Sequence, residues 1–263
     1  MLAHDGPTAL VTGASGGLGE AFAEQLAQQG YNLVLVARSE DKLKMVAQRL
    51  EQLHEIKTTV IAADLGSPAA VEHVIAEVKR RGVDIDLLVN NAGFGIFERF
   101  VETPLPRQME QVDVNIRAVV TLTHAFVQGM VARRKGGVIN LASSAGFQPL
   151  AGANIYAASK SFVILFSEAL AQELVKQRVH VLAVCPGPVA TAFYADKNPA
   201  LSRTQMDDPK SIVREVLRAF DKGKRVLIPG KFSIRMNAFA VRLFPRKLIA
   251  QIAEGTVRKL NHK

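Results

Sequence analysis

Three polar side chains whose types and spacing suit proton transfer lie in the middle of the sequence: Ser143, Tyr156 and Lys160. Tyr156 and Lys160 are four residues apart, so in a helix they share one face. A free phenol, with a pKa of about 10, exchanges protons poorly at neutral pH. A nearby ammonium group lowers that pKa, and a serine hydroxyl can stabilise charge developing on a substrate oxygen. These residues predict a site where Tyr156 moves a proton.

A glycine-rich turn follows the apolar run 9–11 near the start of the chain. Its first glycine allows a tight turn, the next lets the backbone approach a diphosphate, and the last lets a helix pack against a sheet. The helix expected to begin near Glu20 would offer unsatisfied N–H groups and a partial positive charge to phosphates. We therefore expect a dinucleotide site that includes Gly13, Ser15, Gly16, Gly17, Leu18 and Gly19.

The end of the second apolar run, 33–36, distinguishes between two cofactors. An acid at this place binds the ribose hydroxyls of NAD, whereas a base accommodates the 2′-phosphate of NADP. Here Arg38 and Ser39 come first, and the nearest acid is Glu40. Arg38 could simply be a solvated charge at the start of a helix. Its position and the missing acid favour binding of the 2′-phosphate instead. NADP(H) is the expected cofactor, with NAD(H) as the alternative.

Each proton-transfer residue also has a structural interpretation. Tyr156 could pack at a helix start, Ser143 could cap a helix or turn, and Lys160 could be a solvated charge. Their joint occurrence, in this order and after a glycine-rich turn, favours the catalytic interpretation.

Short apolar runs alternate with helical segments along the chain, which predicts an α/β fold with a parallel sheet covered by helices on both faces. Right-handed crossovers make it a doubly wound, Rossmann-type sheet of about seven strands in one domain, residues 1–230. The expected strands are 9–11, 33–36, 59–61, 87–89, 138–141, 179–184 and 226–228. The expected helices are 17–29, 40–54, 68–81, 105–134, 156–177 and 209–221. The stretch 190–208 is expected to be a mobile excursion.

These motifs resemble those of the short-chain dehydrogenase/reductase family over roughly residues 7–230. TGASGGLG at 12–19 is similar to its TGxxxGxG turn, NNAG at 90–93 to its NNAG motif, and YAASK at 156–160 to its YxxxK motif. Ser143 stands thirteen positions before the tyrosine, as the family pattern requires, with Ser144 as a possible second polar contact.

The resemblance implies a catalytic tetrad of Asn115, Ser143, Tyr156 and Lys160. In that family the asparagine holds a water on a proton-relay path, and the lysine also binds the nicotinamide ribose. Asp64 would contact adenine, and the backbone around Val189 would hold the nicotinamide carboxamide. The further cofactor contacts implied are Leu65, Asn91, Ala92, Gly93, Tyr156, Lys160, Pro186, Gly187 and Thr191. No metal is expected.

The resemblance also implies hydride transfer between nicotinamide and a carbonyl or secondary alcohol. Apolar residues where the family sets specificity favour a lipophilic substrate, although Phe and Met at such spacings also suit a core. Those residues are Phe94, Ile96, Phe97, Phe193, Tyr194, Leu201, Met206, Phe232, Ile234, Met236, Phe239, Val241, Leu243 and Phe244. The helices at 105–134 and 156–177 resemble those through which members form homodimers or homotetramers. The alternatives are an NAD-linked dehydrogenase, a cofactor-binding protein without activity, and a membrane-surface protein.

The charge of the chain is concentrated at its end. Residues 231–263 hold eight basic residues against one acid, Glu254, and so carry +7 of the net +9. This segment predicts a basic amphipathic helix pair packed on or near the domain. It could be a lid or oligomer element, an anionic membrane-surface anchor, or a docking patch for acidic carriers. Nucleic-acid binding is not expected, because no recognition motif accompanies the charge.

The single cysteine, Cys185, forms no intramolecular disulfide and is expected to be a small buried apolar residue. The polar stretch Met1–Pro7 lacks the apolar core of a signal peptide, so a cytoplasmic location is expected.

Overall fold

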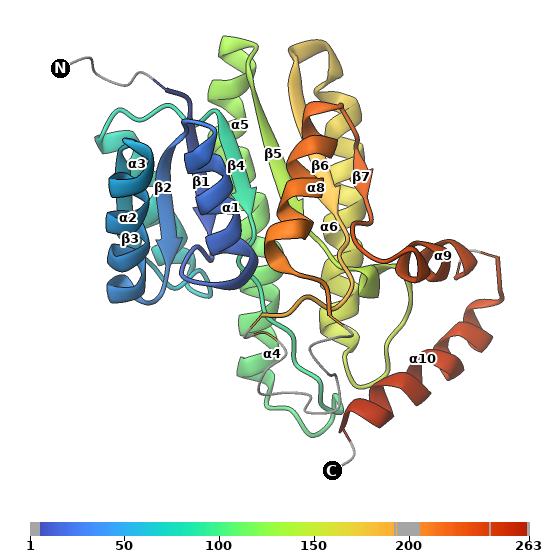
Figure 1. The fold of residues 1–263 in the computed structure, drawn as a ribbon. Helices are drawn as coiled ribbons and strands as arrows, with labels where there is room; N and C mark the ends of the chain where they lie inside the picture. Colours follow the sequence, from blue (N-terminus) through green and yellow to red (C-terminus); the bar gives the residue numbers. More distant parts are fainter. Residues whose placement is uncertain (1–5, 192, 194–205, 242, 262–263) are drawn as a thin grey trace.

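The computed structural model describes residues 6–191, 193, 206–241 and 243–261, with residues 254–261 by their backbone alone. Its centre is a seven-stranded parallel sheet in the order β3-β2-β1-β4-β5-β6-β7 (Figure 1). The strands are β1 (Thr8–Thr12), β2 (Asn32–Ala37), β3 (Thr58–Ala62), β4 (Leu87–Asn90), β5 (Gly136–Leu141), β6 (Val179–Val184) and β7 (Val226–Leu227). The Rossmann-type sheet predicted from the apolar runs is confirmed.

Helices cover both faces of the sheet, because the strands alternate their side chains between two apolar layers. Ala9 and Val11 of β1 belong to one core, while Leu10 belongs to the other. The first core is closed by α1 (Gly17–Gln28), α2 (Glu40–His54) and α8 (Pro209–Asp221). The second is closed by α3 (Pro68–Arg80), α5 (Ala118–Arg133) and α6 (Asn154–Glu173). The α1 helix begins at Gly17, which is the first residue of the expected helix 17–29 and three residues before Glu20.

The segment predicted as one helix over 105–134 is interrupted. It consists of α4 (Leu105–Val112), a π-helical turn, η1 (Asp113–Arg117), and α5. Short 3₁₀ turns also precede and follow α6: η2 (Ser144–Phe147) and η3 (Val175–Gln177). The predicted helix 156–177 is thus α6 followed by η3. π-helical turns inside α-helices often mark functional sites, and Asn115 lies within this one.

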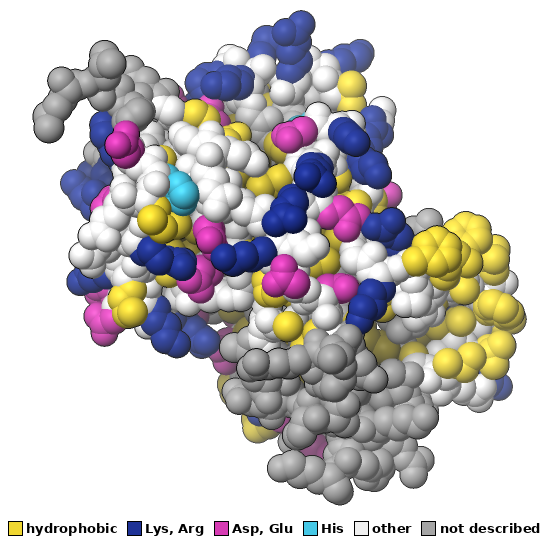
Figure 2. Space-filling view, viewed as in Figure 1, with side chains coloured by type: hydrophobic (Ala, Val, Ile, Leu, Met, Phe, Trp, Pro, Cys, Tyr) yellow, Lys and Arg dark blue, Asp and Glu magenta, His cyan; other side chains and the backbone are white. Residues whose placement is uncertain are grey.

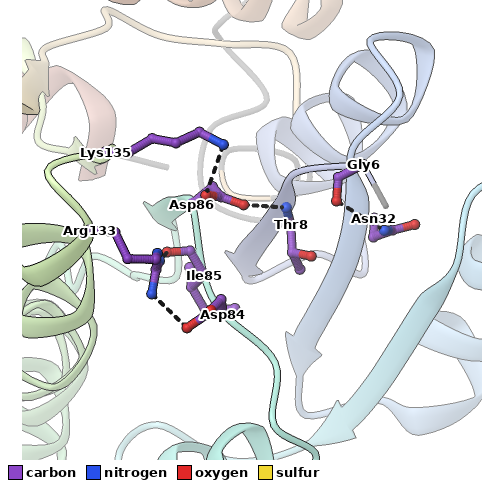
Figure 3. A network of polar contacts seen from close by, with 8 residues as sticks. All are labelled: Gly6, Thr8, Asn32, Asp84, Ile85, Asp86, Arg133 and Lys135. Atoms are coloured by element: carbon purple, nitrogen blue, oxygen red, sulfur yellow. Dashed lines mark hydrogen bonds and ion pairs between the residues drawn. The ribbon is translucent and has the colours of Figure 1, made fainter. Parts of the chain in front are cut away.

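The amino edge of the sheet, where the strands begin, is held by ion pairs (Figure 3). The Asp86 carboxylate accepts a hydrogen bond from the backbone N of Thr8 at 3.0 Å and lies 3.6 Å from Lys135 Nζ. Arg133 contacts Asp84 at 2.6 Å. These contacts tie β1 and the start of β4 to the end of α5.

The segments that hold the predicted site residues follow the strands at the carboxyl edge of the sheet. Strand order reverses between β1 and β4, and in open α/β sheets ligands bind in the crevice at this switch point. The predicted C-terminal helices are present as α9 (Phe232–Ala240) and α10 (Arg246–Asn261), near the carboxyl ends of β5–β7 (Figure 1). The excursion predicted at 190–208 falls mostly outside the described residues; its described ends meet in a bridge between Val189 and Asp207.

Candidate active site

Two adjoining cavities open at the switch point, one of about 250 Å³ and one of about 310 Å³. Gly13, Ala92 and Gly93 line both of them. The first cavity is further lined by Gly16, Gly17, Leu18, Asn91, Leu141, Ala142, Ser143, Tyr156, Lys160, Pro186, Gly187, Val189, Thr191 and Phe193. The second is further lined by Ser15, Ala37, Arg38, Ser39, Lys42, Ala63, Asp64, Leu65, Phe94, Glu110 and Val114. The predicted cofactor residues are thus brought to one trough, with Gly19 as the exception.

The glycines of the glycine-rich turn have two roles: one allows close packing, and another borders open space. A Cβ on Gly19 would lie 2.1 Å from the carbonyl oxygen of Gly13, so this residue is required for the helix to pack against the turn. A Cβ on Gly16 would meet nothing within 4 Å and would point into free space. Gly16 and Gly17 lie at the N-terminus of α1, where helix N–H groups favour anions. The turn therefore leaves open space beside a helix N-terminus, a cradle suited to a diphosphate.

Thr12, at the end of β1, fixes this turn against the segment after β4. Its Oγ1 accepts hydrogen bonds from the backbone N of Asn91 (3.0 Å) and of Ala92 (2.9 Å). The Asn91 side chain donates in return to the Thr12 carbonyl at 2.8 Å. Thr12 is buried, and although it opens the TGxxxGxG motif it was not among the predicted cofactor residues.

The second cavity carries two bases at the end of β2. Arg38 and Lys42 line its wall together with Ser39, and Asp64 and Leu65 line it after β3. Lys42 lies in the first turn of α2, four residues after Arg38 in the sequence, and it was not among the residues predicted. The spacing of two bases across Ser39, where α2 starts, was the signal that could have found it. Two cations and a hydroxyl at one cavity wall are groups that can bind an anion.

Ser143, Tyr156 and Lys160 converge on the first cavity. Tyr156 and Lys160 share the first turns of α6, and Ser143 follows β5 and accepts a hydrogen bond from the backbone N of Ala145 at 3.1 Å. Lys160 Nζ donates to the carbonyl of Leu141 at 2.7 Å and lies 5.9 Å from the centre of the Tyr156 ring. Tyr156 and Lys160 are both almost fully buried.

Burial controls the protonation of both residues. It raises the pKa of Tyr156 above its ordinary value, and a hydrogen bond with Ser143 works in the opposite direction. It lowers the pKa of Lys160 from 10.5 to about 8, against a smaller opposing effect of Cys185. From the sequence, the ammonium of Lys160 was expected to lower the pKa of Tyr156. In the structure desolvation is the larger effect, because the ammonium is directed to the Leu141 carbonyl rather than to the phenol.

Asn115 lies behind the cavities rather than in their walls. Its Nδ2 donates to the carbonyl of Phe94 at 3.0 Å and to the Ser159 hydroxyl at 3.1 Å, and its Oδ1 accepts from the backbone N of Phe94 at 3.2 Å. A Cβ on Gly93 would come within 3.0 Å of this Oδ1 and 3.2 Å of Lys160 Nζ. Asn115 thereby connects the segment after β4 to the helix that carries Tyr156 and Lys160.

A buried row of neutral polar side chains runs across β4 and β5, on the face of the sheet that α5 and α6 cover. Asn90 donates to Thr123 at 3.0 Å and to Asn140 at 2.8 Å, and Asn140 donates to Ser167 at 2.9 Å. This row joins β4 and β5 to α5 and α6, next to the residues that line the first cavity. Buried polar groups that are paired in this way specify one arrangement of the elements around them.

The segment after β6 closes the first cavity on its far side. The carbonyl of Pro186 accepts a hydrogen bond from the backbone N of Ser144 at 2.9 Å, which joins this segment to the turn after Ser143. A Cβ on Gly17 would meet Thr191 at 3.0 Å, so Thr191 lies directly across from the glycine-rich turn.

Apolar rings surround Tyr156 at the outer end of this cavity. Ring centres of Phe97 and Phe193 lie 5.7 Å and 5.8 Å from that of Tyr156. Leu150 and Ala253, the latter from α10, belong to the same cluster. This wall agrees with the predicted apolar substrate pocket.

Several other predicted pocket residues do not face a cavity. Phe232, Met236, Phe239, Leu243 and Phe244 are exposed on the outside of the molecule. The expectation that they form the pocket is wrong, because Phe232, Met236 and Phe239 lie opposite the buried Ala238 of α9, and Leu243 and Phe244 lie in the exposed connection after it. Tyr194 and Leu201 lie outside the described residues.

Known proteins resemble this chain along most of its length. A family model described as short chain dehydrogenase matches residues 7–202. The chain belongs to this family. Very-long-chain 3-oxoacyl-CoA reductase of Homo sapiens is 33% identical over 219 residues, which are 81% of this chain and 68% of that protein.

Two solved structures of dehydrogenases are also similar. A short-chain dehydrogenase from Sphingobium yanoikuyae in complex with NADPH has a TM-score of 0.80 and 31% identity, covering 90% of this chain and 93% of that one. A bulky-bulky ketone specific alcohol dehydrogenase from Comamonas testosteroni has a TM-score of 0.79 and 32% identity, covering 90% and 92%. The chain therefore shares fold and family with oxidoreductases that act on alcohol and ketone groups.

Proposed function

We propose that this protein is an NADP(H)-dependent oxidoreductase that interconverts a lipophilic ketone and its secondary alcohol. One observation carries the proposal. Ser143, Tyr156 and Lys160 face a cavity that continues directly into a second one lined by Arg38 and Lys42. A proton-transfer site and an anion site are thus joined by a glycine-lined trough.

The trough fits a dinucleotide phosphate. Gly16 leaves open space where a side chain would stand, and the N-terminus of α1 favours the diphosphate. Arg38, Lys42 and Ser39 would hold a 2′-phosphate, for which a forked guanidinium and an ammonium are suited. NADPH in the related Sphingobium dehydrogenase supports this choice.

The remaining predicted cofactor contacts are assigned to the same trough. Asp64 and Leu65 would border the adenine, while Asn91, Ala92 and Gly93 shape the floor where the two cavities meet. Pro186, Gly187, Val189 and Thr191 would enclose the nicotinamide end. When bound, the cofactor supplies the hydride in reduction and accepts it in oxidation.

The side chains of the protein handle the proton and the substrate oxygen. In the reducing direction Tyr156 donates its phenolic proton to the oxygen as the carbonyl becomes an alkoxide, and in oxidation it takes that proton back. Ser143 donates a hydrogen bond to the same oxygen and stabilises the charge that develops there. Lys160, positively charged below a pKa of about 8, stabilises the tyrosinate that remains after the proton leaves. Asn115 holds the Phe94 backbone and Ser159, and so positions Lys160.

The substrate is proposed to be lipophilic because the rings of Phe97 and Phe193 flank Tyr156. Two relatives support this class. One is a very-long-chain 3-oxoacyl-CoA reductase, and the other is an alcohol dehydrogenase specific for bulky-bulky ketones.

A homodimer or homotetramer is proposed through the long helices. On the outer side of α6, Phe162 and Phe166 stack with ring centres 5.8 Å apart, and Leu165 is exposed. An exposed apolar stripe of this kind suits pairing with a second copy across a two-fold axis.

Turnover of a ketone panel by matched tyrosine variants tests the proposal. NADPH oxidation is followed with bulky aliphatic and aromatic ketones, and the reverse reaction with the corresponding alcohols. Tyr156→Phe should lower kcat/KM by about 10²–10⁴-fold, while Tyr31→Phe, far from both cavities, should retain wild-type rates. Circular dichroism checks that both variants are folded. Wild-type rates in Tyr156→Phe, or a folded wild type that turns over no ketone or alcohol, would contradict the proposal.

A further inference from the structure

The C-terminal helix α9 has two apolar faces, only one of which is buried. Ile234 and Ala238 face the body of the protein, and Ala238 is buried. Phe232, Met236 and Phe239 recur at helical spacing on the opposite face, where Phe232 is 73% and Phe239 is 59% exposed.

The exposed apolar stripe continues beyond α9. Leu243 and Phe244 in the connection are exposed, as are Leu248 and Ile252 of α10, while Ile249 is buried. Figure 2 shows apolar side chains gathered over α9 and α10 at the right of the view, away from the charged surface over the rest of that face. We call this surface the C-terminal apolar face; it consists of Phe232, Met236, Phe239, Leu243, Phe244, Leu248 and Ile252. A contiguous apolar patch on two neighbouring helices marks an interaction site.

The sequence around the C-terminal apolar face is strongly basic. Residues 231–263 hold eight Lys and Arg residues and one acid, Glu254. One of the bases, Arg235, is paired with Glu215 of α8. Arg246 and Lys247 are exposed at the start of α10, next to Phe244 and Leu248. An apolar stripe with bases beside it is the pattern of a helix that lies in the surface of an anionic bilayer.

We propose that α9 and α10 dock this protein onto the surface of an anionic phospholipid membrane. The apolar face would enter the boundary between headgroups and acyl chains, and the bases would contact lipid phosphates. Among the described helices none is long and apolar enough to cross a bilayer. The proposed contact is peripheral, because Ile249 and Ala253 of α10 are buried against the protein. A second copy of the chain fits this face less well, because a two-fold contact would bring two segments of +7 charge together.

The docking surface is built directly on the walls of the active site. A Cβ on Gly187 would meet Ile234 of α9 at 3.0 Å, and Ala253 of α10 packs in the cluster of Tyr156. The same two helices therefore touch the substrate end of the first cavity with one face and present the apolar face outward. If the proposed function holds, on which this step alone rests, a lipophilic ketone enters the site from the membrane.

Sedimentation with vesicles tests the docking without cofactor or substrate. The full chain is mixed with vesicles of phosphatidylcholine alone or of phosphatidylcholine with phosphatidylglycerol. It should sediment with the anionic vesicles and be released by salt, because surface charge interactions are screened. Sedimentation with neither kind of vesicle would overturn the proposal.

Paired variants separate the apolar and basic contributions. Phe239→Ser with Leu248→Ser should weaken vesicle binding by about 100-fold, since each apolar side chain that leaves water contributes about tenfold. Arg246→Gln with Lys247→Gln should weaken it by about tenfold or more on anionic vesicles only. The controls, Met45→Ser with Leu53→Ser on α2 and Lys57→Gln with Lys79→Gln, change exposed residues elsewhere and should bind as wild type.

Two further readouts distinguish the outcomes. NADPH oxidation with a water-soluble ketone should be unchanged in all four variants, so failure of the proposed function and failure of docking are seen separately. Size-exclusion chromatography reports self-association. If Phe239→Ser with Leu248→Ser breaks an oligomer and leaves vesicle binding unchanged, the face is a contact between copies and the membrane proposal is wrong.

Discussion

The two edges of the sheet differ in how their charged side chains are paired. At the amino edge, Asp86 meets Lys135 and the Thr8 backbone, and Asp84 meets Arg133, so charges are paired where the strands begin (Figure 3). At the carboxyl edge, the buried ammonium of Lys160 is held by a neutral acceptor, the Leu141 carbonyl. Burying a charge beside a neutral group opposes folding, whereas the paired amino edge does not carry that penalty.

Because of this difference, we expect residues at the amino edge to affect mainly stability and residues at the carboxyl edge to affect mainly binding and catalysis. The contacts at the amino edge tie β1 and β4 to α5, and at the carboxyl edge the ends of three strands meet at one trough. Substitutions at the two edges should therefore have different signatures: changed stability with intact chemistry at the amino edge, and lost chemistry or binding at the carboxyl edge.

The largest effect is expected at the glycine-rich turn. Gly19→Ala would place a Cβ 2.1 Å from a backbone oxygen and should leave little folded protein, measured as soluble yield and thermal midpoint. Gly16→Ala meets no neighbouring atom and has extended backbone, so it should fold as wild type and weaken NADPH binding by about tenfold or more. Equal stability of the two variants would contradict the different roles of Gly19 in packing and Gly16 in cofactor binding.

Lys160→Met should abolish most turnover, by about 10²-fold or more, without loss of stability at pH 7. The folded protein holds the Lys160 proton less tightly than the unfolded chain, since its pKa is about 8 instead of 10.5. The wild type should therefore gain unfolding free energy as pH rises from about 8 to about 10.5, by at most about 1.4 kcal/mol per pH unit. The variant should lack this gain.

Chemical denaturation of wild type and Lys160→Met across this pH range measures the difference directly. A parallel pH dependence in both proteins would contradict the assignment of the burial penalty to Lys160. Lower stability of the variant at pH 7 would do the same.

A smaller effect is expected at the amino edge. Asp86→Asn weakens the contacts with Lys135 and the Thr8 backbone and should lower the unfolding free energy by about 1–3 kcal/mol, as for other part-buried hydrogen bonds to a charged group. The kcat/KM per folded molecule should stay unchanged, because Asp86 is at the opposite end of β4 from the cavities. A changed kcat/KM at full folding would show that the two edges are coupled.

Residues whose partners are close in sequence could be predicted. Tyr156 and Lys160 follow from helical spacing, and the turn at Gly13–Gly19 from its position between a strand and a helix. The doubly wound parallel sheet followed from the alternation of apolar runs and helices, because right-handed crossovers leave few arrangements.

Features that depend on distant contacts could not be predicted. The π-helical turn around Asn115 accompanies hydrogen bonds to Phe94, a residue in another segment, and spacing alone gives a continuous helix. The outward face of α9 was predicted as pocket lining, since an apolar residue in a helix does not reveal which face is covered. Lys42 has the appearance of an ordinary helix-surface lysine until the fold places it beside Arg38.

The most direct test of the account is a binding titration of purified protein with NADPH and NADH, followed by nicotinamide fluorescence, in wild type and Arg38→Ala. Arg49→Ala, an exposed arginine paired with Glu20 outside both cavities, is the matched control. The account predicts that wild type and control bind NADPH more tightly than NADH, and that Arg38→Ala loses about 1–3 kcal/mol of NADPH binding with NADH binding unchanged. Equal affinity for the two cofactors, or an Arg38→Ala variant that still prefers NADPH to the same degree, would contradict it.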